Sequence, residues 1–96
     1  MPRVDDRKPV AMQGVMKTAR ARQDVTVSDL SVRGCKIESL YLRVDVGDKI
    51  FLRPEGLEGR PCTVIWCTER AAGIRFDQPF HPAVLDNLWR VHGAEV

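Results

Sequence analysis

The stretch VTVSDLSVRGCKIE (residues 25–38) contains two short alternating runs joined by a polar turn. Apolar and polar side chains alternate at both ends of the stretch, which is the period-two pattern of strands with one buried face. Between the runs, Asp29 and Ser31 can hydrogen-bond to local backbone and hold a turn. Gly34 permits φ > 0 and, lacking a Cβ, lets another group come close. The stretch therefore predicts two strands joined by a well-held turn.

The same period recurs on both sides of this stretch. Turn-forming residues such as Val46-Gly47-Asp48 and Pro54-Glu55-Gly56 separate most of the runs. The further alternating runs cover residues 10–16, 50–53, 62–67 and 72–76. Six short strands without helical patterns between them indicate an antiparallel meander closed into a barrel or a small sandwich. Closure would also remove exposed sheet edges.

The C-terminus changes to helical spacing. Pro82 suits a first helical turn, and Gly93 can end the helix. The residues at helical spacing are Leu85, Leu88, Trp89 and His92. We expect their apolar stripe to pack on the barrel or plug one end, with docking of a partner as the alternative. The expected fold class is all-β, a six-stranded antiparallel β-barrel with a C-terminal α-helix, as one domain over residues 9–96 after a flexible arm at 1–8.

Composition excludes several classes of protein. The formal net charge over 96 residues is 15 − 13 = +2, too small for bulk electrostatic binding to nucleic acid or to an anionic membrane. No run approaches the roughly 18 apolar residues of a membrane span, and the charged N-terminus does not resemble a signal peptide. We therefore expect no membrane insertion and a cytoplasmic location.

The chemistry of catalysis and of metal binding is not evident in the sequence. Cys35, Cys62 and Cys67 are odd in number and lack the spacing of a zinc site, so reduced and mostly buried thiols are expected. His81 and His92 flank the helix, and neither has an evident nucleophile partner. The sequence therefore predicts a binding module, with no enzymatic activity, no metal and no cofactor.

Two segments are hard to explain by packing alone. Arg3 and Arg7 stand four apart in a charged segment, and the turn motif of Asp29, Ser31 and Gly34 follows 22 positions after Arg7. In this order they resemble the PilZ domain family, whose pattern is RxxxR on an N-terminal arm and then [D/N]xSxxG at a strand-to-strand turn. The resemblance continues through Gly34-Cys35-Lys36-Ile37, Val46-Gly47-Asp48, Val64-Ile65-Trp66 and Gly73-Ile74-Arg75-Phe76 to the terminal helix.

The resemblance implies that the ligand is cyclic di-GMP. It assigns Arg3 and Arg7 to guanine edges and phosphate, since a guanidinium donates two hydrogen bonds to guanine O6 and N7. It assigns Asp29 to the N1–H and N2–H₂ donors of guanine, with a short hydroxyl from Ser31 and close backbone approach at Gly34. Arg33 is either a further phosphate contact or a solvated charge. Trp66 is expected in the core, with a base-stacking platform as the alternative.

The resemblance implies a receptor and adaptor. Ligand would draw the arm at residues 1–8 onto the barrel, and a downstream protein partner would read the changed surface. One ligand or an intercalated pair could bind. The alternatives are a PilZ-like adaptor that works without ligand and, from another class, a barrel that binds single-stranded nucleic acid. The second would need aromatic platforms among basic residues, whereas Tyr41, Phe51 and Phe80 are scattered singly. DNA and RNA are therefore not expected as partners.

Overall fold

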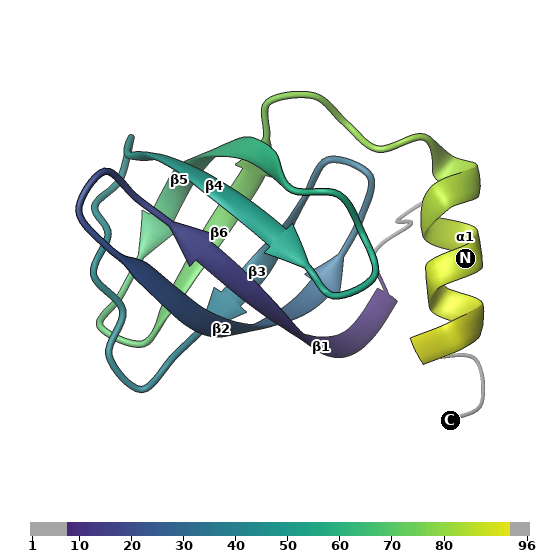
Figure 1. Cartoon of the computed structure of the whole chain (residues 1–96), viewed down its shortest axis with the longest axis horizontal. Coiled ribbons are helices and arrows are strands. Elements are labelled where there is room, and N and C mark those ends of the chain that lie inside the picture. Colours follow the sequence, from purple (N-terminus) through teal and green to yellow (C-terminus); the bar gives the residue numbers. More distant parts are fainter. Residues whose placement is uncertain (1–7, 93–96) are drawn as a thin grey trace, which may run out of the picture.

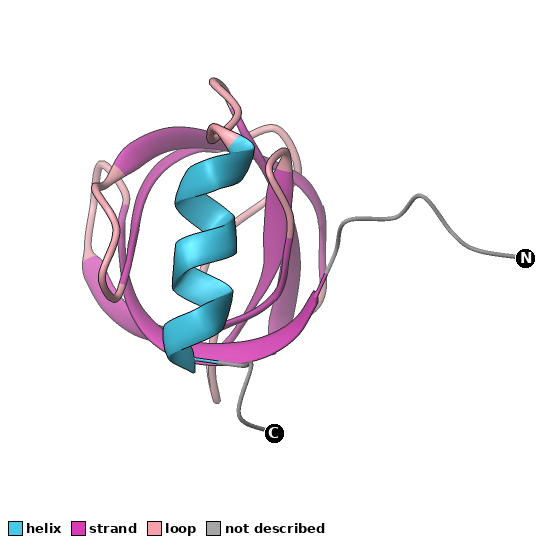
Figure 2. Ribbon diagram, turned by 90° about the vertical axis from the view of Figure 1, so that its right-hand side faces the viewer, coloured by secondary structure: helices cyan, strands magenta, loops and turns pink. Residues whose placement is uncertain are grey.

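The alternating runs form the strands of one closed barrel, and the helical run forms a helix across one end of it (Figures 1 and 2). The computed structural model describes residues 8–92. The strands are β1 (Lys8–Lys17), β2 (Arg22–Leu30), β3 (Gly34–Glu38), β4 (Lys49–Pro54), β5 (Arg60–Cys67) and β6 (Ala71–Phe76), and the helix is α1 (Pro82–His92). The predicted barrel and the start of the predicted helix at Pro82 are both confirmed.

The order of the strands differs from the expected meander. Around the barrel it is β1-β2-β3-β6-β5-β4, with all neighbours antiparallel and β4 closing onto β1. Strands β3 and β4 follow each other in sequence but do not pair. Residues 39–48 lie between them, too long a connection for a tight hairpin, and this loop passes along the end of the barrel opposite α1 (Figure 1). The prediction of a meander was therefore wrong at one connection, the one between β3 and β4.

The core is the inward face of each strand. Strand β4 alternates strictly, with Ile50, Leu52 and Pro54 buried between exposed neighbours, as expected for a strand with one solvated face. Among the other buried residues are Met16, Val27, Ile37, Val64, Ile74 and Phe76. The barrel is thus filled by its own side chains, so a ligand site must lie on the outer surface.

Helix α1 closes one end of this core. Leu85 is fully buried, whereas Val84 beside it is 41% exposed, so one face of the helix covers the barrel. Phe80, just before the helix, is 4% exposed and packs edge-to-face on Phe76 with ring centroids 4.9 Å apart. These contacts support the expectation that the helix packs on the barrel.

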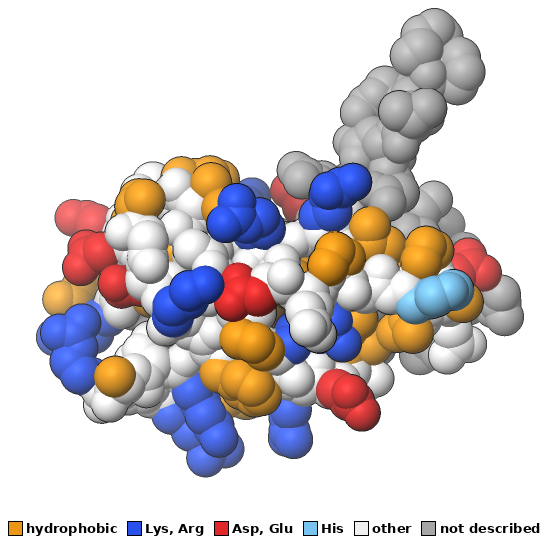
Figure 3. Space-filling view, turned by 90° about the horizontal axis from the view of Figure 1, so that it is seen from above, with side chains coloured by type: hydrophobic (Ala, Val, Ile, Leu, Met, Phe, Trp, Pro, Cys, Tyr) orange, Lys and Arg blue, Asp and Glu red, His pale blue; other side chains and the backbone are white. Residues whose placement is uncertain are grey.

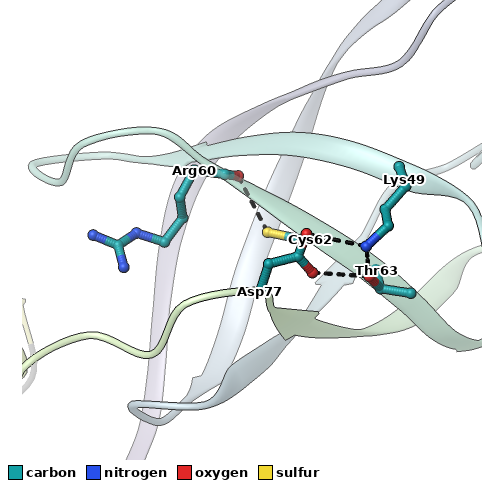
Figure 4. Close-up of polar contacts among 5 residues, drawn as sticks. All are labelled: Lys49, Arg60, Cys62, Thr63 and Asp77. Carbon is teal, nitrogen blue, oxygen red and sulfur yellow. Dashed lines mark hydrogen bonds and ion pairs between the residues drawn. The ribbon is translucent and has the colours of Figure 1, made fainter.

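The segment between β6 and α1 is held by polar contacts to β4 and β5 (Figure 4). The hydroxyl of Thr63 donates to the Asp77 carboxylate at 2.9 Å, and the Lys49 ammonium donates to both groups, at 2.9 Å and 3.1 Å. The Thr63 hydrogen bond, followed by the one from Lys49, lowers the pKa of Asp77 below its usual value. Asp77 therefore stays ionised and keeps these contacts at neutral pH.

Arg60 forms the second anchor of this segment. Its guanidinium lies 3.6 Å from the centre of the Phe80 ring and donates to the Gln78 carbonyl at 2.8 Å. Behind it, the thiol of Cys62 donates to the Arg60 carbonyl at 3.3 Å, and burial raises the pKa of this thiol to about 12. Cys35 is buried like Cys62, and Cys67 is half-buried. The thiols are therefore mostly buried, as expected.

Candidate functional site

Asp29, near the end of β2 and just before the turn to β3, has an unusual backbone conformation. Asp29 has φ = 51°, the only positive φ of a non-glycine residue in the part of the chain that the structure describes. Aspartate is one of the few residues that tolerate this left-handed region. On β1 the register shifts between Lys8 and Ala11, opposite this residue. Asp29 thus lies where the regular pairing of β1 with β2 is interrupted, between the pairs of Ser28 and Leu30.

The hydroxyl of Ser31 holds the turn from within. Ser31 is 5% exposed, and its Oγ accepts from the backbone amides of Arg33 at 3.2 Å and Gly34 at 3.3 Å. Two backbone bonds from outside the turn fix it further: Phe76 N donates to the Arg33 carbonyl at 2.8 Å, and Phe80 N to the Val32 carbonyl at 2.9 Å. Ser31 therefore shapes the loop that carries Asp29 and Arg33, and it does not line the pocket beside them.

Gly34 allows β3 to lie close to β6. A Cβ added to Gly34 would overlap the Ile74 carbonyl oxygen and lie 3.1 Å from its carbonyl carbon. Both of these atoms are backbone, so neither can move aside without shifting a strand. The glycine is therefore required by the fold itself, and it leaves a smooth outer surface where β3 pairs with β6.

Trp66 lies outside the core, so the sequence expectation for this residue was wrong. Its side chain is 44% exposed, because the pairing of β5 with β6 shifts register between Val64 and Trp66 and interrupts the alternation. The indole lies across Gly73, where an added Cβ would come within 2.6 Å of ring atoms Cδ1 and Cε2. A glycine within a strand pattern often marks such a close approach, and it is the signal that could have located the exposed ring.

Asp29, Gly34, Trp66 and Gly73 line one shallow pocket of about 270 Å³ on the outer surface of the barrel. The strand register aligns Lys36, Gly73 and Trp66 in one row across three strands, and Gly34 and Arg75 in the next row. The lining residues are Asp29, Arg33, Gly34, Cys35, Lys36, Ile65, Trp66, Gly73, Ile74 and Arg75. Three cationic side chains, one carboxylate and one indole therefore surround a floor that contains two glycines.

This arrangement suits a planar, anionic ligand. The ring of Trp66 offers a flat apolar face, the cations suit phosphate, and Asp29 accepts hydrogen bonds from a base edge. Over the face seen in Figure 3, Lys and Arg side chains are interspersed with Asp and Glu, so no general field would hold the ligand. Binding would depend on these few placed groups.

A larger groove of about 920 Å³ runs beside β1 and the β4–β5 turn, but its charge is unsuitable for phosphate. Asp24, Glu55 and Glu58 line it, against the single guanidinium of Arg53. Carboxylates repel an anionic ligand. Size alone therefore does not select this groove, and the smaller pocket beside Asp29 is the candidate site.

Arg3 and Arg7 lie outside the described residues. The first described residue, Lys8, pairs with Leu30, the neighbour of Asp29. Arg33 is exposed at the pocket rim, as either of the two sequence interpretations allows. The structure thus brings Asp29, Arg33 and Gly34 together and adds Trp66, Lys36 and Arg75. Among the residues described, no group of three or more metal-ligating side chains occurs, and no helix is long and apolar enough to span a bilayer.

The chain is thus a closed barrel with a cationic, indole-lined pocket on its outer surface. The family model for the PilZ domain matches residues 2–90, and the chain belongs to the PilZ family. PilZ domains are receptors and adaptors that bind cyclic di-GMP, and they are not enzymes. No curated protein matches the chain at a significant level.

The contact between Trp66 and Gly73 gives a prediction for the shape of the pocket. In a Trp89→Phe background, where Trp66 is the only tryptophan, Gly73→Ala should displace the indole into solvent. Its emission should shift to longer wavelength, and acrylamide should quench it more strongly. Gly59→Ala is the matched control, because there the added Cβ meets the Phe51 ring instead. Unchanged Trp66 emission in Gly73→Ala would show that the indole does not lie across residue 73.

Proposed function

We propose that this chain is a cyclic di-GMP receptor whose ligand lies in the pocket beside Asp29 and whose bound form is recognised by a protein partner. The observation that carries the proposal is the meeting of Asp29, Arg33 and Trp66 at one pocket with a floor of glycine. Asp29 and Arg33 come from the β2–β3 corner and Trp66 from β5, and the pocket offers a flat ring, cations and an acceptor for a ligand made of purine bases and phosphates.

Asp29 supplies selectivity for guanine. An ionised carboxylate only accepts hydrogen bonds, and the Watson–Crick edge of guanine presents the N1–H and N2–H₂ donors side by side. Adenine offers no such pair of donors. The left-handed backbone at Asp29 and the tightly bonded loop after it hold the carboxylate at the pocket rim, so little entropy is lost when it binds.

Trp66 and the cations serve the other surfaces of the ligand. A guanine stacked on the exposed indole would gain about 1–3 kcal/mol, the usual range for a base on an aromatic side chain. The cations at the rim, Arg33, Lys36 and Arg75, can approach the two phosphates. Lys36 also lies 3.8 Å from the Glu38 carboxylate, an exposed pair that binding of a phosphate would readily replace. Ser31 contributes to this site indirectly, because its hydroxyl holds the loop in place.

Arg3 and Arg7 complete the site from the preceding segment. Arg7 directly precedes Lys8, the first residue of β1, and Lys8 pairs with Leu30 at the end of β2, next to Asp29. Arg3 lies four positions before Arg7 in the same segment, so in this proposal it contacts the ligand from the same side. In this proposal, ligand binding orders the segment before β1 against the barrel and changes the surface that a partner contacts.

Backbone ¹⁵N relaxation tests this ordering directly. Heteronuclear NOE values of residues 1–7 should rise when cyclic di-GMP saturates the protein, because both arginines become tied to the ligand. Residues of β4, remote from the pocket, serve as the internal reference. Equal values for residues 1–7 with and without ligand would contradict the switch while leaving the binding site intact.

Calorimetric titration with cyclic di-GMP tests the receptor itself. Saturable binding is expected, and Asp29→Ala, Arg7→Ala and Trp66→Ala should each weaken it about tenfold or more, as loss of a contact worth about 1–3 kcal/mol implies. The same titration gives the stoichiometry, one ligand or an intercalated pair.

Matched controls separate the site from general effects of charge. Asp24→Ala removes an exposed aspartate of the same strand, and Arg53→Ala removes an exposed arginine of β4; both should bind as the wild type does. No heat from folded protein at high ligand concentration would overturn the receptor and leave a PilZ domain that works as a ligand-independent adaptor. Equal loss in the control variants would place the ligand elsewhere.

A further inference from the structure

The loop between β3 and β4, residues 39–48, exposes large apolar side chains at the end of the barrel opposite α1 (Figure 1). Leu40 is 88% exposed, and Tyr41 and Val46 are each 63% exposed. Single exposed apolar residues are ordinary on protein surfaces, but three within seven residues of one loop are a feature of interaction sites. No residue of this loop lines the pocket beside Asp29, so the two surfaces are separate.

The loop is firmly held although it contains no regular secondary structure. Its first half is bonded to the β5–β6 turn, with Ser39 N donating to the Arg70 carbonyl and Leu42 N to the Glu69 carbonyl, both at 2.9 Å. Its second half is bonded to β5, where Gly47 N donates to the Val64 carbonyl at 2.8 Å. These bonds fix both halves of the loop against the barrel.

Side chains fix the loop as well. The Gln23 amide donates to the Ser39 hydroxyl at 2.9 Å and to the Tyr41 carbonyl, and the Asp48 carboxylate accepts from Asp45 N at 2.9 Å. Leu42 is 6% exposed and anchors the loop in the core. Leu40 and Tyr41 are therefore presented on a preorganised backbone, so a partner would not have to order the loop on binding.

Of the three exposed apolar residues, Tyr41 borders a hollow that also contains basic groups. A cavity of about 460 Å³ lies between this loop and the β1–β2 turn, and it is lined by Met16, Arg20, Tyr41 and Arg43 among others. The guanidinium of Arg43 lies 5.3 Å from the centre of the Tyr41 ring, a cation–π contact that positions both side chains. Arg20 faces the same hollow from the other turn, and among the described residues Asp45 is the one carboxylate that lines it. The hollow thus combines an apolar surface with two guanidinium groups, those of Arg20 and Arg43.

We propose that this surface docks a protein partner through an acidic segment that carries one large apolar side chain. The apolar side chain would enter the hollow over Met16 and pack on Tyr41, and neighbouring carboxylates would pair with Arg20 and Arg43. Tyrosine and arginine are the residues most enriched among those that dominate binding energy at interfaces. Charge complementarity therefore favours an acidic segment over a basic one, and the exposed apolar side chains of the loop favour a protein over a nucleic acid.

Selection from a phage library of random peptides tests the proposal, because such peptides collect on preformed docking surfaces. Against the full chain, the enriched peptides should carry Asp or Glu next to Leu, Phe or Trp. Tyr41→Ala and Arg43→Glu should each weaken binding of a synthesised peptide about tenfold or more. The matched controls are Phe51→Ala, another exposed ring, and Arg53→Glu, another exposed arginine, both on β4. These should bind as the wild type does.

Several outcomes would overturn the proposal. They are absence of enriched peptides, peptides without acidic residues, and binding that Tyr41→Ala and Arg43→Glu leave unchanged. Two further results would assign the surface to a different occupant: self-association that Tyr41→Ala abolishes, or binding to phosphatidylserine vesicles with the same dependence on Arg43. None of these results bears on cyclic di-GMP, whose binding by the loop variants should equal that of the wild type.

Discussion

The rest of the structure depends on the close approach of β3 to β6 at Gly34. No side-chain carbon fits there, because it would overlap the backbone of Ile74. This contact joins two strands that are far apart in sequence and so allows a six-stranded sheet to close. It also sets the turn that carries Asp29 and Arg33 beside the strand that carries Gly73. One steric constraint therefore creates both the barrel and the floor of its surface pocket.

The second glycine, Gly73, determines the shape of the pocket more than it determines the fold. At Gly73 the atoms nearest to an added Cβ belong to the Trp66 ring, a side chain that can move, whereas at Gly34 they belong to backbone. The register shift in β5 turns Trp66 outward, and Gly73 lets its ring lie against the sheet. Strand β5 also carries Val64, whose backbone is bonded to Gly47 and Asp48 of the exposed loop at residues 39–48. The pocket and the proposed docking surface thus share one strand.

Much of the fold could be predicted because burial in this protein follows period two. The alternation around Val27, Ile37 and Leu52 corresponds to buried positions, and Pro82 marks the start of the helix. The pairing of β3 with β6 could not be predicted, since it depends on contacts between residues distant in sequence. Trp66 was misplaced because a bulge reverses the alternation after Val64, and no local pattern encodes its partner on the neighbouring strand.

The candidate site was predictable where a motif fixes local geometry. Asp29, a motif residue, and Arg33, at a free position of the motif, line the same pocket, and Ser31 is part of the turn between them. That the Ser31 hydroxyl is committed to the backbone of its own loop follows only from three-dimensional contacts. Lys36 and Arg75 were missed for a similar reason, because the register of β3 and β6 places them at the pocket.

The most direct test of the central claim is an ¹H–¹⁵N correlation spectrum of the full chain recorded during titration with cyclic di-GMP. We predict that the largest shifts fall on Asp29, Arg33, Gly34 and Gly73 and on the indole N–H of Trp66. Residues of the acidic groove, such as Asp24 and Glu58, should shift little. The largest shifts in that groove, or none in the loop after Asp29, would contradict the placement of the ligand in this pocket.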